Sequence, residues 1–502
     1  MTSPPSAANT ALHLPVHHTM YYGGAWHQPI SCRFDATLNP STGQPLARVA
    51  VGNAADVDAA VAAAAHGFAE WRAVLPLERG RILRRMAEVL RKNAAELAMI
   101  DAANCGNPVR EMTSDAMVAA AQLDFFAGLV TEMKGASIPM GPDVVNFSVR
   151  EPIGVVARIV PFNHPFMFAA GKSAAPLAAG NSMVLKPPDQ APLSALRLAE
   201  LVDGLLPAGV FNVVPGDRET GAALASHPGV GMVAIIGSVA AGRAVMRAAS
   251  QTVKPLLLEL GGKNALIAYA DADPDEVAAA AVGGMNFTWC GQSCGSTSRA
   301  FVHAAIYDAV LERVKSRVAA FKPGLATDAE TTMGAIVSAA QLERVLSYIE
   351  EARQDGARLL HGGKRPSDST LAGGFFVEPT VFAGVTSAMK IAREEIFGPV
   401  LAIIKWTDEA SMIEDVNAVD YGLTCSIWTN ELSTAHRAAM RVQAGYVWIN
   451  EVGKHFLGAP FGGVKQSGFG REECLGEMLS FTQEKNIHLR LRPRAPDVPT
   501  SS

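Results

Sequence analysis

Cysteine is scarce in this chain of 502 residues. The six cysteines are too few and too scattered for a disulfide framework: Cys32, Cys105, Cys290, Cys294, Cys425 and Cys474. The sequence also lacks paired CxxC motifs and an HExxH motif, so we expect no metal site. Together these absences indicate a reduced, metal-free protein of the cytoplasm.

Targeting segments, membrane helices and basic stripes are also missing. The first residues have no positively charged stretch leading into an apolar core, which a secretory signal needs. The longest uncharged stretch, residues 277–298, is interrupted by Asn286 and Gln292, so we expect a buried or ligand-lining segment there rather than a membrane helix. The net charge of −5 is spread over mixed acidic and basic residues, which argues against a nucleic-acid partner.

The chain is rich instead in short β-branched runs that alternate with Ala-rich helical stretches. Helices are predicted from about Asp56 and over residues 77–104. Strands are predicted at 153–160, 182–186, 210–214, 232–236 and 255–260, with helices such as 194–205 and 240–250 between them. This alternation is typical of a doubly wound, mostly parallel α/β sheet. It restarts after Gly261, with a strand at 264–270 and a helix capped by Asp273, which predicts a second α/β domain.

One segment suggests a nucleophile. In Gly291-Gln292-Ser293-Cys294-Gly295, a cysteine lies among small residues in a stretch too polar for a core helix. Because a thiolate attacks carbonyl carbon readily, Cys294 is a candidate nucleophile. The alternative is a buried apolar cysteine, the commoner fate of this residue type.

Three polar segments directly follow predicted strands. Glu259 precedes two glycines at a strand end, where it is either a partly buried base or a salt-bridged carboxylate. Asn163, in Pro161-Phe162-Asn163-His164-Pro165, is either a rigid donor to an oxyanion or a turn residue. The turn Gly237-Ser238-Val239-Ala240-Ala241-Gly242 opens a helix whose free N–H groups can hold a pyrophosphate, although it is not the GxGxxG fingerprint.

In this order and spacing, the segments resemble the aldehyde dehydrogenase superfamily nearly from end to end. The resemblance also includes Lys186-Pro187-Pro188-Asp189, residues 394–399 and residues 460–468. It implies an α/β fold with a Rossmann-like cofactor domain, a second α/β catalytic domain and a small β oligomerisation extension. The implied ranges are 1–131 with 152–260 for the NAD(P)-binding domain, 261–478 for the catalytic domain, 132–151 with 479–491 for strands that bridge a homodimer or homotetramer, and 492–502 for a disordered tail.

The same resemblance implies an oxidoreductase that converts an aldehyde to the carboxylic acid with NAD, or with NADP as the alternative. Cys294 would attack the aldehyde, Asn163 and the backbone N–H of Cys294 would hold the oxyanion, and Glu259 would activate the water that hydrolyses the thioester. Lys172 and Glu472 match a polar pair that supports Glu259. The implied cofactor-binding residues are Ile159, Pro161, Phe162, Lys186, Asp189, Gly216, Gly237, Ser238, Gly242, Leu260, Glu395 and Phe397.

Several departures from the family pattern bear on cofactor preference and on the aldehyde tunnel. Asp189 stands where many relatives carry Glu, His164 stands where a bulky apolar or aromatic residue is common, and Trp289-Cys290 precedes the nucleophile. We expect an apolar tunnel with a polar mouth at Lys454 and His455, which suits a medium-sized aromatic or aliphatic aldehyde. Alternatively, Lys454 points into solvent and His455 caps a turn.

Three other functions compete with that of a hydrolytic aldehyde dehydrogenase. A CoA-acylating aldehyde dehydrogenase transfers the acyl group to CoA, but the resemblance implies that such branches lack the base that Glu259 supplies here. A non-catalytic binding protein would not need the nucleophile, the base and the amide, all of which are present. A cysteine hydrolase would not need the cofactor segments around Lys186 and Glu395.

Overall fold

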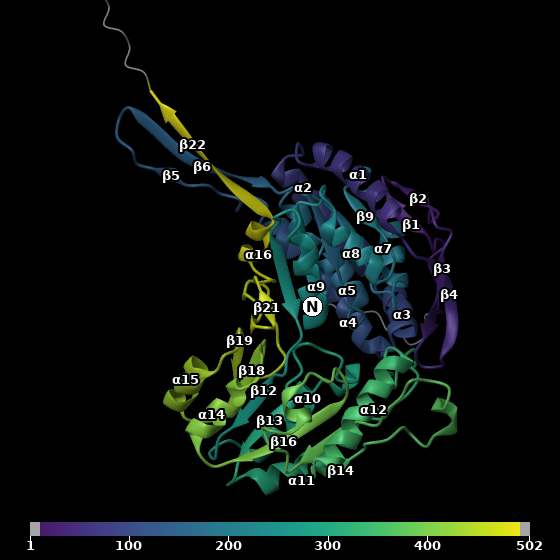
Figure 1. The fold of residues 1–502 in the computed structure, drawn as a ribbon, viewed down its shortest axis with the longest axis vertical. Helices are drawn as coiled ribbons and strands as arrows, with labels where there is room; N and C mark the ends of the chain where they lie inside the picture. Colours follow the sequence, from purple (N-terminus) through teal and green to yellow (C-terminus); the bar gives the residue numbers. More distant parts are fainter. Residues whose placement is uncertain (1–10, 492–502) are drawn as a thin grey trace, which may run out of the picture.

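The computed structural model describes residues 11–491, which form two lobes joined side by side and an arm that projects from the first lobe (Figure 1). The expected tail at 492–502 lies outside the described residues. Each lobe is built around one large sheet with helices on both faces. This is the layered arrangement that alternating strands and helices favour.

The first lobe contains the sheet β2-β1-β9-β8-β7-β10-β11-β21. Its five central strands are parallel, whereas the outer β1, β2 and β21 pair antiparallel. The predicted strands are present here with slightly different ends. The strands are β1 (Met20–Tyr22), β2 (Ala25–His27), β7 (Val155–Ile159), β8 (Ser182–Lys186), β9 (Phe211–Val213), β10 (Met232–Gly237), β11 (Leu256–Leu260) and β21 (Gly468–Phe469).

Successive side chains of these central strands enter two different cores, which explains their nearly continuous apolar sequences. Val156 and Met183 pack against the core on one face, and Val155 and Val184 pack against the core on the other. The first face is covered mainly by α2 (Pro76–Lys92), α3 (Ala94–Cys105), α4 (Val109–Gly128), α5 (Pro165–Gly171), α6 (Ala174–Ala178) and α7 (Leu193–Val202), and the second by α1 (Ala54–Trp71), α8 (Arg218–Ser226) and α9 (Val239–Ala249).

The prediction of one helix over 77–104 is wrong. The segment forms α2 and α3, which are separated by Asn93 with φ −108° and ψ 12°. The Asn93 side chain donates to the Val89 carbonyl oxygen at 2.8 Å, a local bond of the kind that competes with helix continuation. The helix does stop where it was expected, because Gly106 follows it with a left-handed φ of 87°.

The second lobe contains the sheet β14-β15-β16-β13-β12-β18-β19, in which only β14 pairs antiparallel. Its strands are β12 (Ala265–Ala268), β13 (Arg299–His303), β14 (Arg358–His361), β15 (Thr380–Ala383), β16 (Val400–Trp406), β18 (Thr424–Trp428) and β19 (Tyr446–Ile449). Its helices are α10 (Pro274–Gly284), α11 (Tyr307–Val318), α12 (Ala339–Gln354), α13 (Lys390–Arg393), α14 (Glu409–Asn417) and α15 (Leu432–Arg441). Asp273 caps α10 as predicted, because its side chain accepts from the Asp275 N–H.

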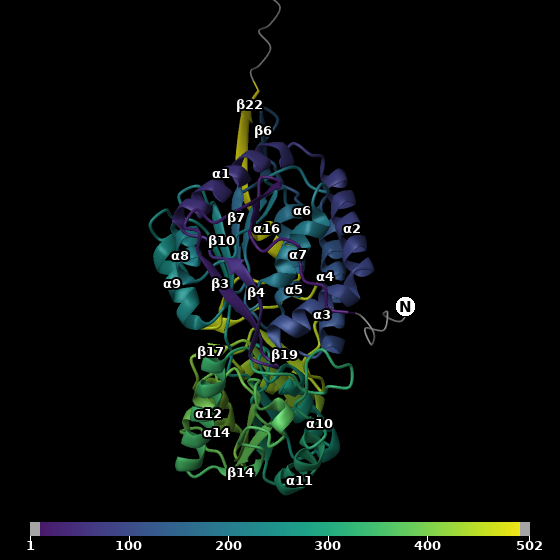
Figure 2. The same ribbon diagram turned by 90° about the vertical axis from the view of Figure 1, so that its right-hand side faces the viewer.

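Two segments tie the lobes together. The hairpin of β3 (Phe34–Asn39) and β4 (Gln44–Ala50) runs down to the second lobe, where the Pro40 carbonyl oxygen accepts from the Phe375 N–H (Figure 2). In the other direction, β21 returns to the first sheet, and α16 (Leu475–Ser480) packs on the first core through Met478. The expected catalytic range 261–478 therefore ends in segments whose contacts are with the first lobe.

The arm is a separate sheet of β5 (Ser137–Ile138), β6 (Val144–Pro152) and β22 (Thr482–Arg490). β6 and β22 pair antiparallel from Thr482 opposite Pro152 to Arg490 opposite Val144. In both ribbon views the arm projects away from the lobes (Figure 1, Figure 2). Within residues 11–491, no helix combines the length and the apolar character that a membrane crossing needs.

Candidate active site

Two cavities meet at Cys294 and Glu259, between the lobes. One, of about 580 Å³, is lined by Asn163, Ser238 and Glu395 among others, and we call it the cofactor cavity. The other, of about 390 Å³, is lined by His164 and Lys172 among others, and we call it the aldehyde cavity. Cys294 and Glu259 line both of them. Cys294 and Glu259 can therefore be reached from both cavities.

The loop that carries Cys294 has an unusual backbone. It follows the short helix η1 (Phe287–Trp289), and Asn286, Cys290 and Gly291 all have left-handed φ values near 54–64°. Such strain in residues other than glycine clusters at functional sites. The Asn264 side chain donates to the Cys294 carbonyl oxygen at 2.6 Å, and the Cys294 N–H has no partner within the described chain. Burial, followed by the charge of Glu259, raises the pKa of the Cys294 thiol.

Cys290 lies in a different environment, although it is only four residues away. It is fully buried and lines neither cavity, and its thiol donates to the Gly334 carbonyl oxygen at 2.9 Å. Burial raises the pKa of this thiol as well. The geometry therefore leaves Cys294 as the cysteine of this loop that a substrate can reach.

Glu259 is buried at the carboxyl end of β11, and only 3% of the residue is exposed. Burial, then the charge of Glu472, raises its pKa to about 8, against an opposing effect of Cys294. The two glycines after it are required by close approach: a Cβ at Gly261 would lie 2.1 Å from Glu395 Oε2, and one at Gly262 would lie 2.8 Å from the Cys294 carbonyl oxygen. The double glycine thus lets Glu259, Cys294 and Glu395 converge.

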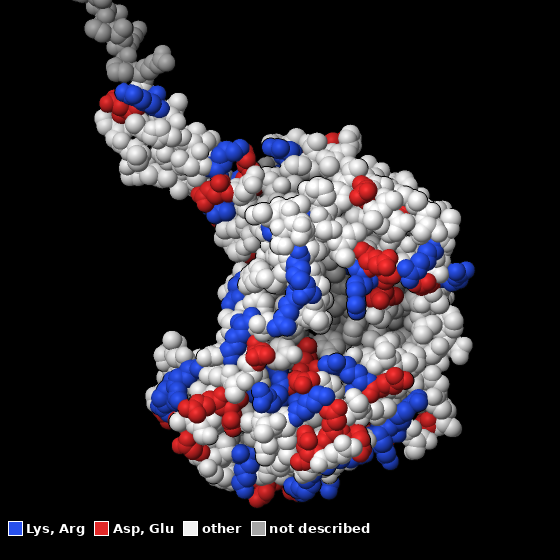
Figure 3. All heavy atoms as spheres, in the orientation of Figure 1, with Lys and Arg blue, Asp and Glu red and all other residues white. Residues whose placement is uncertain are grey.

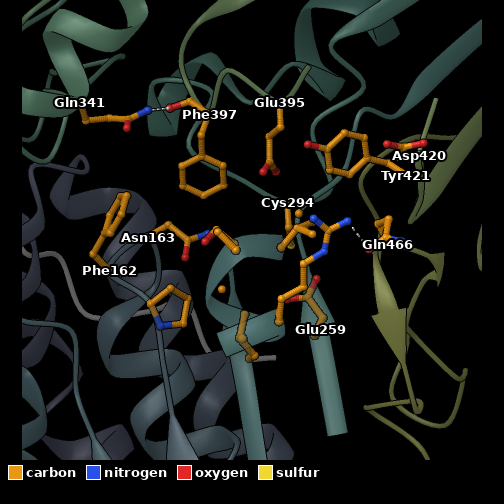
Figure 4. A pocket seen from close by; sticks show the side chains of 18 of the residues that line it. Phe162, Asn163, Glu259, Cys294, Gln341, Glu395, Phe397, Asp420, Tyr421 and Gln466 are labelled. Carbon is orange, nitrogen blue, oxygen red and sulfur yellow. Dashed lines mark hydrogen bonds between the residues drawn. The ribbon is translucent and has the colours of Figure 1, made fainter. Parts of the chain in front are cut away.

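Asn163 is held by its backbone and leaves its amide free. Its carbonyl oxygen accepts from Asn107 Nδ2 at 2.7 Å, whereas its Oδ1 is buried without a partner in the described residues. Figure 4 shows the amide pointing across the cofactor cavity toward Cys294. A free amide beside a free backbone N–H is a suitable pair of donors for an oxyanion.

A buried charge network lies behind Glu259. Lys172 Nζ is 2.9 Å from Glu472 Oε2 and 3.6 Å from Glu473 Oε1, and Arg158 pairs with the other oxygen of Glu472. Burial opposes the ionisation of Glu472, but Lys172 and Arg158 outweigh it and lower its pKa. Glu472 is therefore a fixed negative charge that acts on Glu259.

The far wall of the cofactor cavity comes from the second lobe. Phe397, in a left-handed backbone with φ 55°, stands edge-on to Phe162 with ring centroids 5.7 Å apart. Its carbonyl oxygen accepts from Gln341 Nε2 at 2.9 Å (Figure 4). Glu395 Oε1 accepts from the Gly262 N–H at 2.9 Å, and burial raises the pKa of Glu395 to about 7. The wall thus offers an aromatic face and a carboxyl group directed at Cys294.

A third cavity of about 510 Å³ extends the cofactor cavity beyond Ser238, which lines both. Ser238 caps α9, and its side chain accepts from the Ala241 N–H at 3.2 Å. The third cavity is lined by the predicted Ile159, Lys186 and Asp189. Burial lowers the pKa of Lys186. The combined space, with a helix N-terminus at its middle, fits a dinucleotide whose pyrophosphate lies at α9.

The structure brings most of the predicted site residues together, but not all of them. Pro161, Phe162, Gly237, Glu395 and Phe397 line the cofactor cavity. The three that line none of the three cavities are Gly216, Gly242 and Leu260. Gly242 has a packing role, because a Cβ there would lie 2.5 Å from the Leu260 side chain, so that α9 can approach β11.

Several residues of these cavities were not anticipated. They come from separate loops and helices, and all but Phe461 and Gln466, which belong to the motif at residues 460–468, lie outside the motifs. On the cofactor side they are Arg243, Gln341, Arg344, Asp420, Tyr421 and Gln466, and on the aldehyde side Asp115, Gln122, Phe168, Trp448 and Phe461. Only side-chain charge, as in Arg243, and aromatic character, as in Trp448, could have drawn attention to them.

The expected polar mouth is only partly present. His455 lines the aldehyde cavity, and its Nδ1 lies 3.1 Å from Glu473 Oε2. Lys454 does not line it, because its Nζ pairs with Glu451 at 2.6 Å and its side chain is largely exposed. The apolar part of the cavity lining includes the aromatic residues Phe168, Trp289, Trp448 and Phe461. Figure 3 shows acidic and basic side chains interleaved over the second lobe, with no patch of one sign on the face drawn.

Comparisons with known proteins agree with this geometry. The family model described as the aldehyde dehydrogenase family matches residues 26–487. The aldehyde dehydrogenase TropH of Talaromyces stipitatus is 51% identical over 486 residues, which is 95% of this chain and 94% of that protein. The crystal structure of PnpE from Pseudomonas sp. WBC-3 is 38% identical with a TM-score of 0.93 and covers 96% of this chain and 99% of that one.

An NAD+ complex is among the similar structures. It is the aldehyde dehydrogenase of Bacillus cereus, which is 36% identical with a TM-score of 0.91 and covers 94% of this chain and 96% of that one. The expected α/β fold, the expected enzyme class and the expected nicotinamide cofactor are confirmed by these matches. The chain therefore belongs to the aldehyde dehydrogenase family of NAD(P)-dependent oxidoreductases.

Proposed function

We propose that the chain oxidises an aldehyde to the carboxylic acid through a thioester on Cys294, which water activated by Glu259 hydrolyses. The observation that carries this proposal is that Cys294 and Glu259 are the two residues shared by the cofactor cavity and the aldehyde cavity. A nucleophile and a base at the junction can act on the same carbonyl carbon from both sides.

The residues of the chain perform the steps as follows. Cys294 loses its thiol proton to solvent, and its thiolate Sγ attacks the carbonyl carbon. The Asn163 amide and the Cys294 N–H bind the oxygen as it becomes negative. Loss of hydride from that carbon leaves the thioester. Glu259 then removes a proton from water, the hydroxide adds to the thioester carbon, and the C–S bond breaks to release the acid and regenerate Cys294. The ionised Glu472, held by Lys172 and Arg158, keeps the pKa of Glu259 in the range of a usable base.

The cofactor would be held by residues from both lobes. When bound, NAD(P) supplies the nicotinamide that accepts the hydride. Ser238 and the free N–H groups at the start of α9 suit its pyrophosphate, Lys186 and Asp189 suit the adenosine ribose, and Glu395 and Phe397 suit the nicotinamide end. We infer a preference for NAD, because Asp189 repels the 2′-phosphate of NADP. Arg218 and Arg247 line the same cavity and reduce that preference.

The main rival is transfer of the acyl group to CoA. Glu259 favours water, because water needs a base to act as a nucleophile at neutral pH, whereas the more acidic thiol of CoA depends on one less. The test is to supply purified protein with benzaldehyde and NAD+ in ¹⁸O-labelled water, with and without CoA. We expect NADH, benzoate that carries the label, and no benzoyl-CoA. Formation of benzoyl-CoA with unlabelled product would overturn the hydrolytic assignment. Binding of NAD+ without any turnover would favour a binding protein instead.

For the substrate, we propose a medium-sized aromatic or aliphatic aldehyde. The support is the aldehyde cavity of about 390 Å³, whose walls include Phe168, Trp289, Trp448 and Phe461. Aromatic walls contribute apolar contact area and favour flat ligands through ring stacking. The position of His455 at this cavity gives its mouth one polar group, which is already paired with Glu473.

We also propose that the arm bridges copies of the chain into a homodimer or homotetramer, with 1–131 and 152–260 as the cofactor domain and 261–478 as the catalytic domain. The support for the bridge is a set of exposed apolar side chains on and beside the arm: Ile138, Met140, Val145, Leu489 and Leu491. We propose the cytoplasm as the location, since all six cysteines are free.

A further inference from the structure

His164 and Asp115 form a pair on the wall of the aldehyde cavity that the proposed chemistry does not use. His164 precedes α5, and its Nδ1 lies 2.7 Å from Asp115 Oδ2 on α4. Both residues line the aldehyde cavity and neither lines the cofactor cavity. The His164 ring packs beside Trp289 and Phe168, with centroids 5.4 Å from each. The pair thus holds one imidazole at a fixed place on an aromatic wall.

The orientation of the ring decides what it offers to a ligand. Asp115 occupies Nδ1, so the tautomer and the ring plane are set by that bond. The other nitrogen, Nε2, has no partner within residues 11–491 and is not one of the fully buried polar atoms. Since the ring lines the cavity, Nε2 is the polar atom that His164 presents to its contents.

Nε2 can act as a donor or as an acceptor. Burial disfavours the imidazolium, but Asp115, and then Asp101 on α3 and Glu111 on α4, outweigh burial and raise the pKa of His164. In both forms of the ring Nδ1–H is bonded to Asp115; Nε2 donates in the charged form and accepts in the neutral form. A donor that belongs to a cation forms stronger hydrogen bonds than a neutral one.

The remaining charges of the cavity favour a neutral ligand group over a carboxylate. Asp115 compensates His164, Glu473 is 3.1 Å from His455, and Glu472 is 2.9 Å from Lys172. A free carboxylate would meet these acidic groups without an unpaired cation to receive it. A hydroxyl group can accept or donate a hydrogen bond and carries no charge, so it suits Nε2 of His164 in either form of the ring.

We propose that the aldehyde cavity selects aromatic aldehydes that carry a ring hydroxyl, which forms a hydrogen bond with His164 Nε2. This proposal rests on the proposed function, since it assumes that the aldehyde reaches Cys294 through this cavity. His164 contacts the substrate, and Asp115 is a positioning residue that fixes the imidazole. Phe168 and Trp289 supply the flat surface on which the ring lies.

The test compares ring-matched substrates. For each ring position, kcat/KM is measured for the hydroxybenzaldehyde and for the methylbenzaldehyde of similar size, together with benzaldehyde and 4-carboxybenzaldehyde. For at least one ring position, we expect the wild-type protein to favour the hydroxyl by about 10- to 100-fold. His164→Phe keeps an aromatic ring against Trp289 and should reduce that ratio to near one. His164→Gln keeps an N–H donor and should restore part of the ratio. Asp115→Asn should lower it.

The control is Phe461→Leu, which alters the apolar wall and should change hydroxyl and methyl substrates alike. An unchanged hydroxyl-to-methyl ratio in His164→Phe, or no hydroxyl preference in the wild type, would overturn the proposal. So would a preference for 4-carboxybenzaldehyde. If His164→Phe does not fold, His164→Gln decides: equal losses for every substrate would mean a purely structural role. Failure of the proposed function is recognised separately, because the wild type would then form no NADH from any of these aldehydes.

Discussion

The cofactor cavity and the aldehyde cavity share Cys294 and Glu259 but are built differently. The cofactor cavity is lined mostly by strand ends and the turns after them, as with Asn163, Ser238 and Glu259. The aldehyde cavity is lined by the faces of α4 and α5 and by loops of the second lobe, as with Asp115, Met167 and His455. The side that meets a fixed cofactor is thus formed by short motifs, and the side that meets a variable substrate is formed by scattered side chains.

The two sides also differ in whether their basic side chains are paired with carboxylates. On the aldehyde side, Lys172, His164 and His455 are each paired with a carboxylate. On the cofactor side, Arg218, Arg243 and Arg247 pair with no carboxylate among the described residues, and Arg243 donates to Gln466 instead. Unpaired cations suit a ligand that carries phosphates, whereas paired charges suit a neutral aldehyde.

The largest expected effect comes from removing Cys294, one of the two residues that line both cavities. Cys294→Ala should lower kcat by on the order of 10⁴-fold or more, because no other reachable thiol can form the thioester. Binding of NAD+, followed by fluorescence titration, should persist. The matched control is Cys290→Ala, which removes a buried thiol outside both cavities and should keep most of the activity. Loss of activity in Cys290→Ala with retention in Cys294→Ala would reverse the assignment.

Removing the base should separate the two half-reactions. Glu259→Gln keeps the size of the side chain but cannot accept a proton, so hydrolysis of the thioester should slow by about 10²–10⁴-fold while hydride transfer continues. Rapid mixing with aldehyde and NAD+ should then show about one NADH per active site, followed by near silence. Steady turnover at the wild-type rate would mean that another group activates the water.

The next largest effect should be a loss of stability when the charge network behind Glu259 is broken. Glu472→Gln leaves Arg158 buried without its carboxylate partner and Lys172 with only the longer contact to Glu473. Breaking a buried pair in this way costs about 3–5 kcal/mol in the free energy of unfolding. Chemical denaturation measures the loss. The control is Glu451→Gln, which breaks the exposed pair with Lys454 and should cost less than about 1 kcal/mol. Equal losses in both variants would show that the network does not carry buried charge.

The pH dependence follows from the raised pKa of Glu259. A carboxyl with a pKa of about 8 is protonated and inactive as a base below that pH. When hydrolysis limits the rate, kcat should therefore rise about tenfold per pH unit up to about pH 8 and then level off. Glu472→Gln removes a negative charge that raises this pKa, so the midpoint should move to lower pH. A profile with a midpoint near the ordinary carboxyl value would contradict the burial argument.

The same contrast explains how much of the molecule could be predicted from the sequence. Strands such as β8 could be predicted because buried parallel strands are short apolar runs. Cys294, Glu259 and Asn163 could be selected as candidates because their motifs are contiguous, and the structure places all three at the cofactor cavity. The break at Asn93 could not, because a local side-chain bond to Val89 overrides an amphipathic pattern. The pairing of His164 with Asp115 also could not, since 49 residues separate them and only the packing of α4 on α5 joins them.

The smallest expected effect lies at the adenosine end of the cofactor side, where one acidic group sits among several basic ones. Asp189→Asn removes the charge that repels a 2′-phosphate and leaves Lys186, Arg218 and Arg247 around the cavity. Because the site is open to solvent, the gain in kcat/KM for NADP should be only about five- to tenfold, which corresponds to roughly 1 kcal/mol. The kcat/KM for NAD should fall a few-fold, because an amide accepts hydrogen bonds from the ribose hydroxyls less strongly than a carboxylate.

The control is Asp420→Asn, which makes the same change at the nicotinamide end of the cofactor cavity and should affect both cofactors alike. Steady-state kinetics with each cofactor at low ionic strength measures the ratio, and added salt should reduce the difference between Asp189→Asn and the wild type. A wild-type protein that already uses NADP better than NAD would show that the three basic groups outweigh Asp189.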